Sequence, residues 1–196
     1  METEQVMQKI REIGANEVKN GNAPPEVYTR LAIEKGIQLA NEMNADVQVV
    51  EAALWLGDSQ LALCMKQNRA QEHVQVSAEF ARIAMKEAGA SQEFVENAVQ
   101  AMSEHHSTKH KNLEGEIVAN ADGYKFLQPL GLLSLVMKDA KKRSDIETLK
   151  YALSKLEEKW NVLTIQQCKD ETRQNYDALK FVLESAIQKA TQLNYE

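Results

Sequence analysis

Residues 51–65, "EAALWLGDSQLALCM", decide the fold because ten of these fifteen residues are apolar. Such a run predicts a helix, beginning near Asp46, that is buried on almost all sides. Gly57 and Asp58 interrupt the run at its centre. Glycine costs about 1 kcal/mol relative to alanine inside a helix, and an unpaired buried carboxylate costs more. We therefore expect the Gly-Asp pair to have a functional reason.

The sequence around this stretch carries helical periodicity, and no segment has a convincing strand pattern. Pro24 and Pro25 suit the first turn of one helix, Gly89 suits the end of another, and Ser91 can cap the start of the next. Pro129 opens a further helix. The expected helices, besides the one from Asp46, cover residues 24–43, 72–88, 92–106, 112–126 and 129–143, followed by two more. The chain is thus predicted to be all-α, as a single domain over residues 1–196.

The last two helices each carry an apolar seam with alternating steps of three and four residues. Ser144 and Glu147 form a capping box at the start of the first. The seam residues are Ile146, Leu149, Leu153, Leu156, Trp160 and Leu163, then Tyr176, Leu179, Leu183, Ala186, Ala190 and Leu193. Two such seams in succession predict an antiparallel helical hairpin. Packing of the hairpin on its own chain is favoured, and a homodimer seam is the alternative.

Composition narrows the classes of function. Hydrophobic residues make up 43% of the chain, the net charge is −6, and Gly and Pro number 8 and 3. The acidic balance predicts a soluble protein without general nucleic-acid binding, and the basic clusters at 109–111 and 138–143 are expected to be solvated helix ends or loops. No signal peptide or membrane span is expected. Cys64 and Cys168 form no metal or redox motif, which favours reduced thiols in the cytoplasm.

Several polar residues fall on faces that the periodicity turns inward. These are Asp58, His73, His105, His106 and Asp122. Imidazole and carboxylate groups together suit Zn, Fe, Mn and Ni, and a bound metal can activate water for attack on phosphorus. The competing interpretation is that each histidine caps or packs at a helix end. His106 and His110 have a chelating spacing, yet "HHSTKHK" is expected to be an exposed loop. There is no H-E-x-x-H motif.

Four motifs in order resemble the HD-domain superfamily of metal-dependent phosphohydrolases, in particular its small predicted HD hydrolases. "ADVQVVEAALWLGD" is similar to the helix that ends in "AALLHD" in the family, and "EHVQVSAEFARIAMKEAG" to the helix after it. Residues 98–133 resemble the stretch from "IxxH" through "DADrLdalGaiG", and residues 154–184 resemble the terminal region. The resemblance implies an HD-like helical bundle over about residues 24–135 with a C-terminal helical extension over 136–196.

The resemblance also implies where a metal would bind. The first family histidine falls on Val27, the His-Asp doublet on Gly57-Asp58, and the later aspartate on Asp122. The first aspartate of "DAD" is Asn120, and additional family histidines fall on His73 and His105. Two of the four core ligands are therefore replaced. A displaced site of Asp58, His73, His105 and Asp122 would still offer two acids and two imidazoles for Mn, Fe, Ni, Zn or Mg.

Three functions remain open from the sequence. The first is a divergent HD phosphohydrolase acting on a phosphate ester or nucleotide. Asp58, His73 and His105 would be catalytic there, and Lys125 and Arg82 would neutralise phosphate. The second is a metal-free HD-fold domain that binds a ligand or a protein. The third is a helical scaffold that dimerises through its C-terminal seams.

Overall fold

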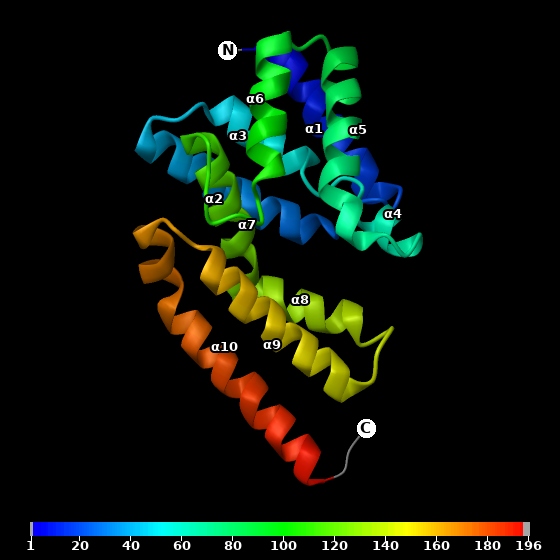
Figure 1. The fold of residues 1–196 in the computed structure, drawn as a ribbon, viewed down its shortest axis with the longest axis vertical. Helices are drawn as coiled ribbons and strands as arrows, with labels where there is room; N and C mark the ends of the chain where they lie inside the picture. The colour runs from blue at the N-terminus through cyan, green and yellow to red at the C-terminus, as the bar shows by residue number, and fades with distance from the viewer. Residues whose placement is uncertain (1, 194–196) are drawn as a thin grey trace. The chain divides into compact units, whose positions relative to one another are not determined.

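The computed structural model describes residues 2–193, and the secondary structure in this range is entirely helical, without a strand. This confirms the all-α class. Figure 1 shows the helices in chain order. They are α1 (Glu4–Lys19), α2 (Glu26–Met43), α3 (Val47–Leu56), α4 (Leu61–Lys66), the 3₁₀ helix η1 (Ala70–Glu72), α5 (His73–Ala88), α6 (Gln92–Ser103), α7 (Leu113–Leu127), α8 (Pro129–Asp139), α9 (Asp145–Val162) and α10 (Gln166–Gln192).

The chain divides into two compact units, the first ending at Asp122 and the second beginning at Gly123. The boundary lies within α7. The single-domain expectation remains a prediction, and each unit is described by itself. Among the described residues, no helix is long and apolar enough to span a membrane.

Helix α3 is the centre of the first unit, as its composition predicts. It packs against α1, α2, α5 and α6, and Val50, Ala52 and Leu56 are fully buried. Glycine allows the closest approaches: a Cβ on Gly36 of α2 would overlap the Leu54 Cδ1 atom of α3. Tight packing around this short apolar helix forms a central part of the core of the unit.

The helix predicted to run unbroken through residues 51–65 is interrupted. Helix α3 ends at Leu56, a turn covers residues 57–60, and α4 begins at Leu61. Partners from distant parts of the chain favour the break. The Ala62 amide donates to the Asn22 carbonyl oxygen at 2.7 Å, and the Gln60 amide donates to Ser77 Oγ at 3.2 Å. These hydrogen bonds replace those of a continuous helix, and the turn carries Asp58.

The local signals for helix ends are confirmed at several positions. Gly89 ends α5 with a left-handed φ of 96°, and the Ser91 side chain accepts from the Phe94 amide at the start of α6. Helix α6 is shorter than predicted, because it ends at Ser103 rather than at residue 106. Helix α8 likewise ends at Asp139 rather than at residue 143, so most of the basic run 138–143 follows the helix.

The second unit contains the predicted hairpin. Helix α9 packs against α10 on one side and α8 on the other (Figure 1). The Trp160 and Tyr176 rings, one from each seam, stack with centroids 4.4 Å apart. The capping box of Ser144 and Glu147 is present. The seams therefore meet within one chain, and a homodimer remains a prediction. An apolar stripe on α8 is exposed and consists of Leu130, Leu133 and Met137.

Candidate metal centre

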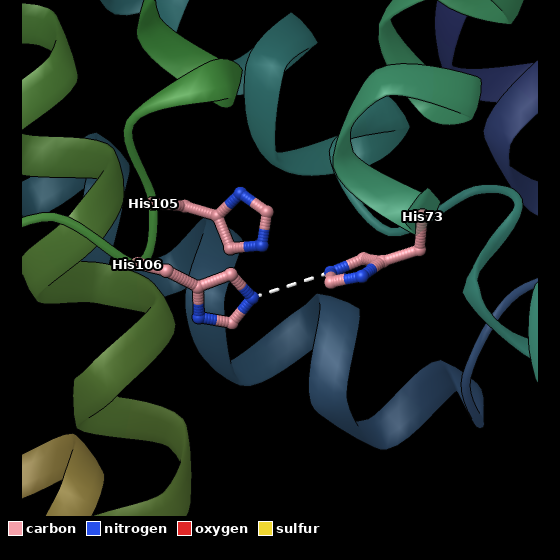
Figure 2. A group of neighbouring side chains, drawn as sticks. All are labelled: His73, His105 and His106. Carbon is pink, nitrogen blue, oxygen red and sulfur yellow. Dashed lines mark hydrogen bonds between the residues drawn. The ribbon is translucent and has the colours of Figure 1, made fainter. Parts of the chain in front are cut away.

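Three segments of the first unit bring four of the polar residues together. Asp58 lies in the turn after α3, His73 is the first residue of α5, and His105 and His106 directly follow α6. Figure 2 shows the three imidazole rings facing one another. Each of these side chains lies at or just beyond the end of a helix, so regular helix geometry does not fix the direction in which it points.

His73 is held by the 3₁₀ turn that precedes it. Its Nδ1 atom lies 2.7 Å from the carbonyl oxygen of Ala70. Because a carbonyl only accepts, Nδ1 carries the proton, and Nε2 of the neutral ring presents its lone pair. Burial lowers the pKa of His73 below its usual 6.5, against the opposing effects of Asp58, the Ala70 carbonyl and Asp122. The ring is therefore neutral near pH 7, the form in which an imidazole can bind a metal.

His105 repeats this arrangement from the end of α6. Its Nδ1 atom lies 2.6 Å from the carbonyl oxygen of Met102, and the residue is only 3% exposed. The same argument assigns the proton to Nδ1 and directs the lone pair of Nε2 away from the helix. A metal-binding histidine is usually fixed in this way, by donation from its other nitrogen to a carbonyl or carboxylate.

The Nε2 atoms of the histidines and the Asp58 carboxylate lie close together. Asp58 Oδ1 lies 3.6 Å from His73 Nε2 and 3.5 Å from His105 Nε2. His106 Nε2 lies 3.2 Å from His73 Nε2, and candidate ligand nitrogens of the three histidines all lie within 4.8 Å of one another. Two ligands of a tetrahedral ion with bonds of about 2.0–2.1 Å are about 3.3 Å apart. The spacing of this group therefore fits such an ion.

His106 is the member of the group that sequence reasoning left without a role. A helix continuing to residue 106 would turn consecutive side chains about 100° apart. Because α6 ends at Ser103, both rings can turn to the same side, and the His105 and His106 centroids are 4.0 Å apart. His106 is exposed, whereas His105 is buried. The site is thus reached by solvent from the His106 side. The signal in the sequence that could have identified His106 as a candidate ligand is the doublet "HH" at the end of a helix.

The remaining residues of the sequence prediction have different surroundings. Asp122 is buried on α7, and its charge favours the protonated form of His73. Its place in the ligand set remains a prediction. Arg82 faces Glu96 at 3.5 Å, and Lys125 is buried. His110 is not in an exposed loop position as expected: its side chain is 6% exposed, and Nδ1 lies 3.9 Å from Glu104 Oε2.

The structure shows the surroundings of the two positions at which the family resemblance would place a histidine. Val27 is a half-buried residue on α2. Gly57 is buried, and a Cβ atom there would lie 2.9 Å from the backbone oxygen of Ala53. A side chain at position 57 would therefore require the end of α3 to shift.

Comparison with known proteins supports the fold. No family model matches the chain, and no curated protein matches it. The chain is similar to the crystal structure of a Lactobacillus plantarum protein determined as a Northeast Structural Genomics target, with a TM-score of 0.72. The two are 14% identical, and the match covers 98% of this chain and 100% of the other. The chain is thus an all-α protein with a histidine-rich candidate metal centre.

Proposed function

We propose that the protein is a metal-dependent phosphohydrolase, divergent from the HD-domain enzymes that its sequence resembles, and that it acts on a phosphate ester or nucleotide. One observation carries the proposal. His73 and His105 each donate Nδ1–H to a backbone carbonyl, and each directs Nε2 toward Asp58 Oδ1 at 3.5–3.6 Å. Two histidines oriented alike toward a carboxylate are what a metal centre needs.

The donor atoms narrow the choice of metal. Three imidazoles with one carboxylate favour Zn, Fe or Ni over Mn and Mg, which prefer oxygen ligands. A bound ion of this kind would polarise a phosphoryl oxygen and lower the pKa of its water toward 7. His105 and His73 would hold it from the buried side, and His106 from the exposed side. Asp58 would either complete the ligands or accept a proton at Oδ1.

The test uses tag-free protein loaded separately with Zn, Fe, Ni, Mn and Mg. We expect stoichiometric binding of a nitrogen-preferring ion and hydrolysis of a phosphomonoester or nucleotide. Asp58→Ala should lose the activity, whereas Asp177→Ala, at an exposed position on α10, should keep it. Protein that binds none of these ions and hydrolyses none of these substrates would overturn the proposal.

A second candidate is a metal-free HD-type module that binds a ligand or a protein. Val27 and Gly57 favour it, because neither supplies an imidazole and a side chain at position 57 would require the end of α3 to shift. Under this alternative, wild-type protein stays metal-free, and the double variant Val27→His with Gly57→His gains metal affinity if the end of α3 can shift. Metal binding by the wild-type protein decides against it. Under either candidate the buried thiols Cys64 and Cys168 fit the cytoplasm.

A further inference from the structure

The segment that carries His105 and His106 is a loop, residues 104–112, between α6 and α7. Short-range contacts brace its middle. The Ser107 amide donates to the Glu104 carbonyl oxygen at 2.7 Å, and Ser107 Oγ both donates to the Lys109 carbonyl at 2.7 Å and accepts from the Lys109 amide at 3.0 Å. These bonds shape the loop but do not join its end to α6.

The carboxylate of Glu104 makes that connection. Its side chain is 12% exposed. Oε1 accepts from Gln100 Nε2 at 2.6 Å, and Oε2 accepts from the Lys111 amide at 3.0 Å, with His110 Nδ1 3.9 Å away. Hydrogen bonds to an ionised acceptor are roughly twice as strong as neutral ones. One largely buried carboxylate thus joins the last turn of α6 to the residues just before α7.

A glycine in α7 makes room for this carboxylate. A Cβ atom on Gly115 would lie 2.6 Å from Glu104 Oε2 and 3.1 Å from Asn112 Oδ1. Asn112 Oδ1 in turn accepts from the Gly115 amide at 2.9 Å. Glycine within a helix costs about 1 kcal/mol, and the space that it leaves is filled by the Glu104 carboxylate. The position of Glu104 is therefore supported by two separate features, its acceptor bonds and the missing Cβ.

We propose that Glu104 is a positioning residue for the candidate metal centre, closing the loop so that His106 faces His73. The inference rests on the proposed function. His105 has its own anchors, a buried ring and the bond to Met102. His106 is exposed, and its direction depends on the loop. Opening the loop should therefore weaken the contribution of His106 to metal binding and leave His105 in place.

Two variants test this role by different routes. Glu104→Ala removes the acceptor, whereas Gly115→Ala keeps it but displaces it through the added Cβ. Glu87→Ala, at an exposed position on α5, is the control. We expect both loop variants to weaken Co²⁺ binding about 10–100-fold, the usual effect of losing a supporting contact around a metal ligand. The visible spectrum of Co²⁺ should change with the ligand number. Glu104→Gln, which retains one oxygen acceptor, should recover part of the affinity.

A second readout needs no metal. In metal-free protein, the Lys111 amide should exchange with solvent at least about tenfold faster in Glu104→Ala and Gly115→Ala, because its hydrogen bond is lost or displaced. The His106 ring resonances should move while those of His105 stay. Folded variants with wild-type Co²⁺ affinity and unchanged Lys111 exchange would overturn the proposal. If the wild-type protein binds no Co²⁺ but Lys111 exchange responds, the metal function fails and the loop closure stands.

Discussion

Replacing His106 with alanine should weaken metal binding strongly and leave the fold intact. His106 is exposed and lies after the end of α6, so its ring contributes little to the core. It contacts both other rings: the Nε2 atom is 3.2 Å from His73 Nε2, and its ring centroid is 4.0 Å from that of His105. An exposed side chain that contacts two histidines is well placed for binding a metal and poorly placed for stabilising the fold.

The size of the effect follows from the number of ligands. Structural zinc sites with four ligands have apparent binding free energies of about 10–16 kcal/mol, or about 2.5–4 kcal/mol for each ligand. A tenfold change in affinity corresponds to about 1.4 kcal/mol. Loss of His106 should therefore raise the Kd for Zn²⁺ about 10²–10³-fold. His73→Ala should do at least as much, because His73 is close to both Asp58 and His106.

Titration calorimetry with Zn²⁺ and thermal unfolding of each variant measure the two parts of this prediction. Lys109→Ala is the control, since its side chain is exposed in the same loop. The reasoning would be refuted if His106→Ala bound Zn²⁺ as tightly as the wild-type protein. If Asp122→Asn then lost binding instead, the ligand set would be the one predicted from sequence, with Asp58, His73, His105 and Asp122.

Three further predictions concern stability. Burial lowers the pKa of His73 below 6.5, so as the pH falls the histidine is protonated in the unfolded chain before it is protonated in the folded one. Metal-free protein should therefore lose stability as the pH falls below about 6.5. Urea unfolding between pH 8 and 5 measures this loss, and His73→Gln should reduce the dependence of the unfolding free energy on pH. Gly57→Ala should lower the free energy of unfolding by about 1–3 kcal/mol through the contact with the Ala53 oxygen, and a variant as stable as wild type would disprove it. Arg11→Ala should lower the free energy of unfolding in urea by about 2 kcal/mol, because Glu51 loses hydrogen bonds of 2.7 and 3.0 Å. Adding Glu51→Gln to this variant should recover part of the lost stability.

The helical class and many helix ends could be predicted because their causes are local. Gly89, Ser91 and the Ser144 capping box act on residues a few positions away, and all three are confirmed. The break after α3 could not be predicted. It depends on acceptors from distant segments, such as the Asn22 carbonyl for Ala62, which periodicity does not reveal. The position of Asp58 follows from that break. The sequence could therefore identify Asp58 as a candidate site residue but could not predict which side chains surround it.

The candidate ligands lie at helix ends for a physical reason. The last carbonyls of a helix have no partner within it. Met102 is in the last turn of α6, and its oxygen is therefore available to His105 Nδ1. A histidine inside a helix would compete with backbone amides for such an acceptor. Fixing Nδ1 in this way turns Nε2 toward the candidate metal centre. The early end of α6 thus explains two properties at once, the tautomer of His105 and the freedom of His106 to turn toward His73. A variant that extended α6 to residue 106 would be expected to lose both.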